Sequence, residues 1–550
     1  MAEEKGLARE LGVAPFLAAL LCRRGLRDAT VAGNFLQPKL KALGDPFELP
    51  NMEAAVSRIL AAIDHKERIV LYGDYDVDGV ASLALLAKLL DAYGAHPGTF
   101  LPQRMDEGYG LSPEGVTRCL TTLKPQLLIA LDCGTSSVEE IASLRSGGVD
   151  VVVFDHHEIK NALPDCVLVN PKLGEKFHYL CTAGIVFKAC HALLKRRPLP
   201  GFDLRDFLDI VALGTVADIV PLVEENRILV QKGLLQMENT RWTGLRELMT
   251  VAGVKPPISP GDVGFRLGPR LNAAGRLGTA ADSLKLLLTD DLAEARLLAT
   301  SLDQQNQERQ LVEQRTLRAA EKKVAEIFVA GRDATIVLGE NGWHPGVLGI
   351  VASRISKNFH RPTFIIGFDE NGIGKGSGRS ITGFSLVNAL KACGGHLEKF
   401  GGHEMAAGLT VRLERFPEFQ RAFLDFARSQ LTDEDLLPRL KIDGEVDIGE
   451  LDMEFLGHHE KLQPFGIGNP QPLFFARGVK PLAEPRVLKE KHLLFNLRQN
   501  GSKTSAIFFN GAATELPRPP WDIAFRVERN EFRDNVTLQV QIVALREAVE

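Results

Sequence analysis

Residues 68–82 read Arg-Ile-Val-Leu-Tyr-Gly-Asp-Tyr-Asp-Val-Asp-Gly-Val-Ala-Ser, an apolar run that ends in a glycine-bounded loop with three aspartates. The apolar run predicts a buried strand, and the residues after the loop have helical spacing. Asp74, Asp76 and Asp78 alternate along the loop, so their carboxylates can converge on one point. Negative charges that close raise one another's pKa, and a hard divalent cation relieves the repulsion. The stretch therefore predicts a metal site at the carboxyl end of a strand.

Two further apolar runs, residues 127–131 and 149–154, end in the same way. The polar residues that follow them are Asp132 and Asp155-His156-His157-Glu158. In open α/β sheets, ligands collect outside the carboxyl ends of the strands, so these side chains should face one crevice. Asp218 adds a fourth acidic position along the chain, and it lies in a mostly apolar segment, where charged residues are uncommon unless they have a partner. Carboxylates combined with imidazoles suit Mn²⁺ or Mg²⁺.

Each of these residues also has an ordinary structural explanation. An aspartate at a strand end often caps a helix, and a single Asp-His-His can be a polar loop. Their joint occurrence in this order favours the metal site. A second histidine pair, His458-His459-Glu460, follows no apolar strand and lacks partner carboxylates, so a solvated loop or a helix end is expected there.

The chain of 550 residues is too long for one core, so we expect roughly two to four domains. The predicted fold class is α/β, with a parallel-sheet catalytic domain, a long connecting helix, a second α/β domain and a C-terminal β-barrel. The expected segments are a helical leader packed on the catalytic domain (1–66), the catalytic domain (67–289), the connecting helix (290–330), the second domain (331–435), a linker (436–469) and the barrel (470–550).

The formal net charge of -5 is not that of a purely electrostatic nucleic-acid binder, so any DNA site should be a local basic groove. Seven cysteines without a C-x-x-C pair favour a reduced, cytoplasmic protein. No apolar leader or membrane-length apolar run is present in the sequence, which predicts a soluble protein without a membrane partner. Without a heptad repeat for dimerisation, a monomer is expected.

The order Asp-x-Asp, Asp, Asp-His-His, Asp resembles the DHH phosphoesterase superfamily motif for motif. The resemblance implies two metal ions, bridged by Asp132, that clamp a phosphodiester and activate water for an in-line displacement. It places one ion on Asp78, Asp132, His156 and Asp218, and the other on Asp76 and Asp132. Many members carry a histidine where this chain has Tyr72, so Asp74 or His157 would complete the second site.

The expected metal ligands are therefore Asp74, Asp76, Asp78, Asp132, Asp155, His156 and Asp218, and the expected catalytic residues are Asp132, His156 and His157. His157 would lie against the scissile phosphate or orient the metal ligands.

Two glycine-rich stretches, residues 374–380 and 400–408, lie in the second domain. Glycine loops let backbone N–H groups approach a phosphate, and Arg379 with Ser377 can add an ion pair and a hydroxyl contact, although ordinary turns are the alternative. Both stretches resemble the DHH-associated domain, whose Gly-Gly-His, here ending in His403, faces the metals.

Over the whole chain the resemblance is to the RecJ family, through residues 73–79, 266–277, 376–380 and 464–470. It implies an exonuclease that degrades single-stranded DNA from 5′ to 3′, releases 5′-mononucleotides and acts in recombination and repair. It also implies a single-strand-binding protein and a helicase as partners.

The same resemblance assigns the DNA contacts. Arg104, Ser377 and Arg379 would grip the 5′-terminal phosphate, and Tyr109 would stack on a base or wall the channel. The strand backbone would be contacted near the metals by Arg270, Asn272 and Arg276, for which helix-surface or core-paired arginines are the alternative.

The barrel resembles an oligonucleotide-binding (OB) fold, whose groove combines basic and aromatic residues. The candidates are Arg486, Lys489, Lys491, His492, Phe495, Arg498 and Phe508, although alternating phenylalanines are more often barrel core.

Two other functions stay open. A phosphodiesterase for short RNA or a signalling dinucleotide would end after the glycine-rich domain, whereas this chain continues into a barrel. A non-enzymatic scaffold would have lost metal ligands, whereas every carboxylate of the core pattern is present.

Overall fold

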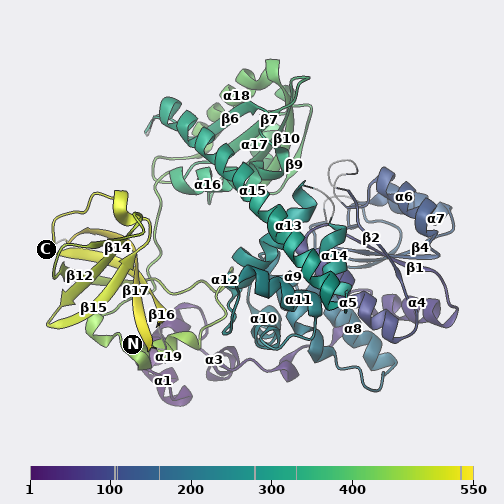
Figure 1. The fold of residues 1–550 in the computed structure, drawn as a ribbon, viewed down its shortest axis with the longest axis horizontal. Coiled ribbons are helices and arrows are strands. Elements are labelled where there is room, and N and C mark those ends of the chain that lie inside the picture. The colour runs from purple at the N-terminus through teal and green to yellow at the C-terminus, as the bar shows by residue number, and fades with distance from the viewer. Residues whose placement is uncertain are drawn as a thin grey trace.

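The computed structural model describes residues 2–103, 107, 110–159, 162–277, 280–329, 331–532 and 535–548. It contains three sheets, each with its own hydrophobic core, arranged as three bodies joined by helices (Figure 1). Among the helices in this part of the chain, none is long and apolar enough to cross a membrane.

The first sheet is fully parallel and has the strand order β2-β1-β3-β4-β5. Its strands are β1 (Ile69–Gly73), β2 (Gly98–Phe100), β3 (Leu127–Leu131), β4 (Asp150–Phe154) and β5 (Val167–Val169). The next strand, β2, pairs with one edge of β1. The chain then crosses over, and β3 pairs with the other edge of β1. The carboxyl ends of β1 and β3 therefore meet at a topological switch point, where open α/β sheets bind their ligands.

Helices cover both faces of this sheet, which explains why its strands are apolar at almost every position. Val70 and Tyr72 pack toward α6 (Pro113–Leu123) and α7 (Val138–Ser146). Ile69 and Leu71 pack on the other face. The helices on that side are α4 (Met52–Asp64), α5 (Val77–Ala92), α8 (Thr182–Arg196), α9 (Leu208–Ala217) and α10 (Glu224–Met237).

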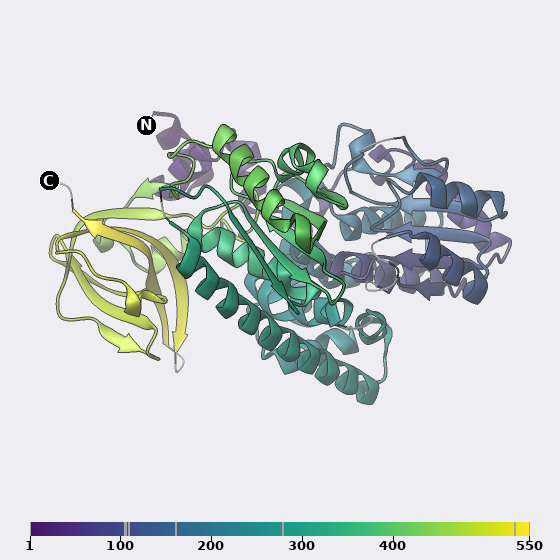
Figure 2. The same ribbon diagram turned by 90° about the horizontal axis from the view of Figure 1, so that it is seen from above.

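A single helix of 36 residues, α15 (Leu292–Ile327), joins the first sheet domain to the second, as the sequence predicted. It packs against the helices α11 (Thr243–Ala252), α13 (Gly268–Leu277) and α14 (Ala281–Leu288) at one end and α16 (Pro345–Phe359) at the other. Figure 2 shows α15 running beneath the second sheet. Glu313 of α15 is buried and pairs with Arg309 of the same helix and with Arg354 of α16, at 2.5 and 2.6 Å, so charge pairing fixes the second domain on the connecting helix.

The second sheet has the order β6-β7-β8-β10-β9 and is parallel only between β6 and β7. Its elements are β6 (Ile336–Asn341), β7 (Thr363–Phe368), β8 (Ile373–Arg379), β9 (Lys399–Gly402), β10 (Ala406–Arg412), α17 (Leu386–Ala392) and α18 (Phe416–Gln430). One face packs on α17 and α18 and the other on α15 and α16. The predicted parallel-sheet domain, long helix and second α/β domain are confirmed.

The third sheet curls into a barrel with the order β11-β12-β16-β17-β15-β14-β13, closed by pairing between β12 and β14. Its elements are β11 (Gly444–Glu445), α19 (Met453–Glu460), β12 (Phe474–Pro481), β13 (Arg486–Leu488), β14 (His492–Gln499), β15 (Ser502–Phe508), β16 (Trp521–Phe532) and β17 (Asn535–Glu547). The predicted OB-type barrel is confirmed. The segment 436–469, expected to be a linker, differs from that expectation because β11 and α19 are built into the barrel body.

The helical leader also differs from its expected place. Its first three helices, α1 (Ala2–Leu11), α2 (Pro15–Arg23) and α3 (Ala29–Leu36), share a core with the barrel, whereas the segment 40–48 and α4 pack on the catalytic sheet domain. Phe16 stacks on Phe455 of α19 at 4.1 Å between ring centroids. Both termini accordingly lie beside the barrel (Figure 1). Helical periodicity shows that such helices have an apolar face, but it does not show which surface that face covers.

The catalytic sheet domain, the leader and the barrel meet around a buried arginine. Arg227 of α10 donates to the carbonyl oxygens of Phe35 and Leu462, both at 2.9 Å, and its guanidinium lies 3.7 Å from the Phe35 ring centroid. Next to it, the Leu222 N–H donates to the Ile467 carbonyl at 2.7 Å. The stretch 464–470 therefore docks on the segment that follows Asp218.

His459 lies in the barrel core rather than in a solvated loop. Its side chain is buried against Phe465 and Phe474, and neither ring nitrogen has a hydrogen-bond partner within the described residues. Burial lowers the pKa of His459 to about 4. His458, His459 and Glu460 form the end of α19, which is one of the two alternatives that the sequence predicted, but the burial of His459 was not predicted.

We predict that this histidine makes the protein acid-sensitive. The unfolded chain binds a proton on His459 below about pH 6.5, whereas the folded chain does so only near pH 4, so the free energy of unfolding should fall by up to about 3 kcal/mol across that window. Urea unfolding from pH 7 to pH 4 should show a weaker pH dependence for His459→Phe than for the wild type. The exposed His65→Gln is the control, and equal slopes in all three proteins would contradict the prediction.

Candidate metal centre

The aspartate loop owes its shape to the start of α5. Asp76 is the N-cap residue, and its carboxylate accepts hydrogen bonds from the Asp78 and Gly79 N–H groups at 2.9 and 3.2 Å. A side chain at position 79 would come within 2.5 Å of the Asp74 carbonyl oxygen, so only glycine lets the loop close this tightly. The loop thereby holds Asp74, Asp76 and Asp78 at the carboxyl end of β1.

The N-terminus of α8 holds two of the acids in place. The Asp78 carboxylate accepts hydrogen bonds from the Thr182 and Ala183 N–H groups at 2.7 and 2.8 Å. The Thr182 hydroxyl donates to Asp132 at 2.9 Å. Helix N-termini favour negative charge. Sequence reasoning missed Thr182, and its only signal was a hydroxyl residue at the start of a helix.

Asp132 and Asp218 approach from two other elements. Asp132 follows β3 in the left-handed region, with φ of 64°, which aspartate tolerates better than most residues and which is common at functional sites. Asp218 ends α9. A side chain at Gly214 of α9 would come within 3.0 Å of the Asp78 carboxylate, so this glycine allows α9 to bring Asp218 to the cluster.

Three groups of ligand atoms lie close enough to hold metal ions, with all atoms of a group within 4.8 Å of one another. The groups are Asp78-His156-Asp218, Asp132-His156-His157 and Asp74-Asp76-Asp132. His156 Nε2 lies 3.5 Å from carboxylate oxygens of both Asp132 and Asp218. His156 Nε2 and Asp218 Oδ2 are buried without a hydrogen-bond partner in the described structure. Buried polar atoms normally have partners, so these two fit a bound cation.

Asp155, predicted as a ligand, belongs to none of these groups. Its carboxylate accepts hydrogen bonds from the backbone N–H groups of Thr135, His156 and His157, at 3.0, 2.8 and 3.2 Å. It also lies 2.7 Å from Nδ1 of the His157 ring. With its oxygens occupied, Asp155 orients His157 instead of binding metal, and the prediction is corrected on this point.

Tyr72 does not contribute to the cluster. Its ring is buried on the opposite face of the sheet, stacked on Phe100 at 4.8 Å, and its hydroxyl donates to the Gly110 carbonyl at 3.0 Å. Of the two expected substitutes for the missing histidine, Asp74 falls in a group with Asp76 and Asp132, and His157 falls in a group with Asp132 and His156.

Burial and crowding make the cluster unfavourable for ionised carboxylates. Burial, and then the neighbouring carboxylates, raise the pKa of Asp78, Asp132 and Asp218 above the ordinary range. Burial lowers the pKa of His156 to about 4, which keeps its imidazole neutral and able to bind a metal. Burial also opposes protonation of His157, but the hydrogen bond and charge of Asp155 outweigh it and raise the pKa of His157.

Two predicted substrate residues of the second domain, Ser377 and Arg379, lie beside the turn of α16 that runs from Gly346 to Gly349. A side chain at Gly349 would come within 3.0 Å of both the Ser377 hydroxyl and the Arg379 guanidinium. Arg276 of α13 reaches the same turn and donates to the Gly346 carbonyl at 3.2 Å. The structure therefore brings three predicted phosphate contacts to one helical turn.

The glycines around Ser377 serve packing rather than phosphate binding. Gly374, Gly376 and Gly378 lie in strand β8, where added side chains would meet Phe368, Ile366 and Phe364 at 2.8 Å or less. Residues 373–379 are therefore a strand, not the phosphate-binding loop that the sequence suggested.

Only some of the other predicted DNA contacts line a groove that could hold a strand. Asn272 and Arg276 line a groove of about 790 Å³ between α13, α15 and α16. Arg270 is instead paired with Asp303 of α15 at 2.8 Å, which is the structural alternative that the sequence left open. His403 is exposed after β9, and its charge acts on Glu158, next to His157. Arg104 and Tyr109 lie outside the described residues.

Of the predicted DNA-binding residues of the barrel, the phenylalanines face the core and the cations are exposed. Phe495 is buried in the barrel core and Phe508 packs against it, so neither offers a ring to a base. His492 accepts a hydrogen bond from the Asn510 N–H at 3.0 Å. The exposed cations among the candidates are Arg486, Lys489, Lys491 and Arg498.

Three family models match the chain in succession. The DHH family N-terminal domain matches residues 68–215, the DHHA1 domain residues 325–429 and the RecJ OB domain residues 442–544. The last match begins before residue 470, in agreement with the structural extent of the barrel. A clustered carboxylate–imidazole site on this domain order defines a phosphoesterase of the DHH class.

Relatives that match nearly the whole of this chain identify the family. The chain is 37% identical to the single-stranded-DNA-specific exonuclease RecJ of Bacillus subtilis over 98% of this chain and 69% of that one, and 34% identical to RecJ of Escherichia coli over 96% and 95%. A crystal structure of RecJ from Thermus thermophilus in complex with Mn²⁺ matches with a TM-score of 0.85 and 32% identity, covering 100% of this chain and 78% of that one. The chain belongs to the RecJ family.

The crowded carboxylates predict that Asp132→Asn is more stable than the wild type without metal and less stable with metal. At pH 8 without metal, Asp132→Asn should unfold with a free energy at least about 1 kcal/mol above that of the wild type, because one buried charge is removed. With Mn²⁺ the order should reverse, since the wild type gains about 2.7 kcal/mol at a hundredfold excess over Kd. Thermal unfolding with EDTA and with Mn²⁺ measures both effects, and Asp425→Asn on the surface is the control. A wild type more stable than Asp132→Asn in EDTA would contradict this.

Thr182 should matter for metal binding without touching the metal. Thr182→Val removes the hydroxyl that orients Asp132, and we expect Mn²⁺ affinity to fall about tenfold, with Thr182→Ser restoring it. Calorimetric titration with Mn²⁺ measures this. Thr122→Val, which removes an exposed hydroxyl bonded within α6, is the matched control. Equal Mn²⁺ affinity in the wild type and Thr182→Val would rule out the orienting role.

Proposed function

We propose that this protein is a metal-dependent exonuclease that degrades single-stranded DNA from 5′ to 3′ and releases 5′-mononucleotides. The observation that carries the proposal is the complete carboxylate–imidazole cluster at the switch point of the first sheet, in a chain whose relatives are named single-stranded-DNA-specific exonucleases. A scaffold that had lost its chemistry would not keep Asp78, Asp132 and Asp218 crowded together, where burial and neighbouring charges raise the pKa of each.

Two divalent ions, Mn²⁺ or Mg²⁺, fit the three ligand groups, and structures of RecJ from Thermus thermophilus are in complex with each of these metals. Asp78, His156 and Asp218 would hold one ion, Asp74 and Asp76 the other, and Asp132 both. Bound there, the ions supply the positive charge that lowers the pKa of the attacking water and stabilises charge on the phosphate.

His157 has the position and the partners to act on the substrate. Its side chain is about a third exposed and lies at the edge of the buried cluster. The Asp155 carboxylate contacts its Nδ1 at 2.7 Å, which orients the ring. Because Asp155 raises the pKa of His157, the protonated ring persists to higher pH and can donate to a phosphate oxygen. His156 is deeper and stays neutral, which suits a ligand.

The direction of digestion would follow from a terminal phosphate site. Ser377 and Arg379, which lie beside Gly349 of α16, combine a hydroxyl and a guanidinium, a pair that binds phosphate well. We include Arg104 in this site from the sequence. A 5′-phosphate held there would present the first internucleotide bond to the metals.

The wider biological part of the proposal rests on family membership. We infer a role in DNA recombination and repair, with a helicase supplying single strands and a single-strand-binding protein as a partner. We also infer that the protein acts as a monomer in the cytoplasm.

The direct test uses single-stranded DNA labelled at the 5′ or the 3′ end, with Mn²⁺ or Mg²⁺ and with blunt duplex as a control. The 5′ label should be released first, as a mononucleotide, and from single strands only. Asp132→Ala should reduce the rate by more than about 100-fold, whereas the surface control Asp425→Ala should not change it.

Replacing the 5′-phosphate by a hydroxyl should raise KM for the wild type but not for Arg379→Ala, which has already lost that contact. Cleavage of short oligoribonucleotides or cyclic dinucleotides in place of DNA would favour the rival phosphodiesterase. Early release of the 3′ label would refute the proposed polarity.

A further inference from the structure

A strained residue directly follows the proposed metal ligand Asp218. Ile219 lies in the left-handed region of the backbone, with φ of 63°. Residues with a branched side chain rarely adopt this conformation, because it is strained. The Ile219 side chain is 68% exposed, so burial of that side chain does not offset the strain. Contacts made elsewhere must therefore hold the chain in this conformation.

The position of the Asp218 side chain depends on its backbone. The Asp78 carboxylate accepts hydrogen bonds from two N–H groups of α8, and Asp132 accepts one from the Thr182 hydroxyl. In the part of the chain that the structure describes, Oδ2 of Asp218 is buried without a hydrogen-bond partner, and His156 Nε2 lies 3.5 Å from it. The path of the chain at the end of α9 therefore sets where this carboxylate lies.

A turn of the barrel body, residues 466–469, contacts the chain that follows Ile219. We call it the docking turn, and its ends are joined by hydrogen bonds between Gly466 and Asn469. The Leu222 N–H donates a hydrogen bond to the carbonyl oxygen of Ile467 at 2.7 Å. The Leu222 side chain is buried in the core of the catalytic domain. The contact thus joins the barrel body to the loop between α9 and α10.

Two glycines let the docking turn come this close to the loop. A side chain at Gly466 would come within 2.7 Å of the Leu222 side chain. One at Gly468 would come within 2.9 Å of Val223 and 3.1 Å of Pro221. Gly468 also has φ of 74°, which glycine adopts without strain. The close fit leaves this loop no room to shift toward the barrel.

The docking turn is itself fixed from two sides. Asn469 is buried, and its side-chain amide donates hydrogen bonds to the carbonyl oxygens of Leu462 and Pro464, both at 2.8 Å. From the leader, Arg24 donates to the Asn469 side chain and to the Pro470 carbonyl oxygen. The leader and the barrel body therefore hold the docking turn together.

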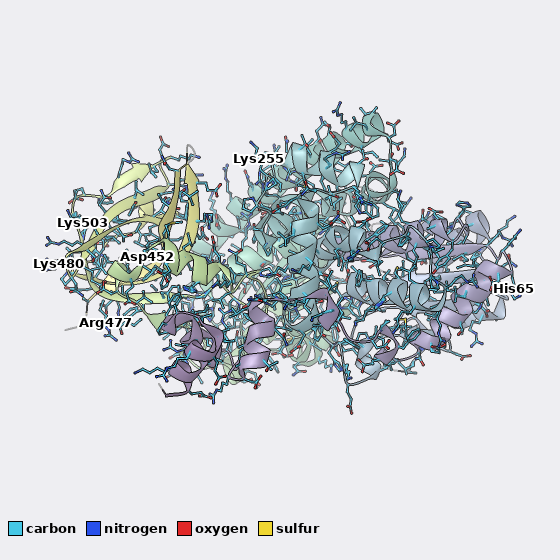
Figure 3. The ribbon with its side chains drawn as sticks, turned by 90° about the horizontal axis from the view of Figure 1, so that it is seen from below. His65, Lys255, Asp452, Arg477, Lys480 and Lys503 are labelled. Atoms are coloured by element: carbon cyan, nitrogen blue, oxygen red, sulfur yellow. The ribbon has the colours of Figure 1, made fainter. Side chains whose placement is uncertain are left out.

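The barrel and the catalytic sheet lie at opposite ends of the molecule. Figure 3 shows Asp452, at the start of α19 in the barrel body, far from His65, which follows α4 of the catalytic domain. The docking turn is a point at which the barrel body reaches across to the loop that begins at Asp218.

We propose that the docking turn positions the metal ligand Asp218. By holding the loop after α9 in its strained conformation, it keeps the end of that helix from fraying, so that Asp218 stays beside Asp78 and His156. The inference rests on the proposed function, because it takes Asp218 as a ligand of one of the two ions. It adds that the barrel body sets the metal affinity of the catalytic domain.

Calorimetric titration of the full-length protein with Mn²⁺, without DNA, tests this inference. Gly468→Ala adds a methyl group that pushes the docking turn away from Val223, and we expect Kd for Mn²⁺ to rise about tenfold. Gly501→Ala, in an exposed turn of the same barrel, is the matched control, because Gly501 also has a positive φ, of 88°, but has open space around it. Asp218→Asn removes the ligand itself and should weaken binding further.

A rescue variant separates positioning from a general loss of structure. Ile219→Gly removes the strain of the left-handed conformation, so the loop no longer needs the docking turn to hold it. The double variant with Ile219→Gly and Gly468→Ala should recover most of the wild-type affinity for Mn²⁺. If circular dichroism shows that Gly468→Ala does not fold, Arg24→Met takes its place. It removes the hydrogen bonds of the leader to the docking turn, and it should give a smaller rise in Kd that Ile219→Gly also relieves.

Equal Kd values for Gly468→Ala and Gly501→Ala, with Asp218→Asn impaired, would overturn the inference and leave the proposed function standing. A defect of Gly468→Ala that Ile219→Gly did not relieve would also overturn it. If Asp218→Asn bound Mn²⁺ as the wild type does, Asp218 would not be a ligand, and the inference would fall with that assignment. Because the titration uses no DNA, a failure to degrade single strands would count against the proposed function alone.

Discussion

The repulsion among buried carboxylates is the constraint on which this structure depends. Asp78, Asp132 and Asp218 come from three different elements and are brought within reach of one histidine nitrogen. Such a cluster lowers the free energy of unfolding, and a bound cation offsets this cost. The fold opposes this cost with the hydrogen bonds of the α8 N-terminus and with the dense apolar packing around β1 and β3. Metal binding and stability are thereby coupled in one place.

The rest of the molecule carries a substrate to this cluster. The connecting helix α15 sets the second domain against α13, so that Arg276 and Arg379 both approach the turn of α16 between Gly346 and Gly349. The barrel is fixed to the catalytic domain, because Arg227 of α10 donates hydrogen bonds to carbonyl groups of both the leader and the segment before β12. The stretch 464–470 contacts the residues just after Asp218, so the position of the barrel and that of a metal ligand are set together.

Much of the candidate site could be predicted from the sequence because its residues follow apolar strands at carboxyl ends, and parallel pairing brings such ends together. The errors have a common cause. Asp155 stands where a ligand was expected, yet backbone N–H groups occupy its oxygens, and Arg270 is used by Asp303. Thr182 was missed because a threonine at a helix start is unremarkable until the carboxylates beside it are seen. The residue type of a side chain does not show which group in the folded protein it will bond to.

The sequence by itself determined the order of the domains, the parallel sheet, the long helix, and the residue types of a divalent-metal site. These follow from hydrophobic periodicity and from charges placed at strand ends, which are local properties of the chain. Only the tertiary structure decided that the first three helices of the leader pack on the barrel, and that Gly374 and Gly378 of β8 pack against phenyl rings. Those outcomes depend on which distant surfaces meet, and strand register and helix packing are long-range interactions that local patterns do not specify.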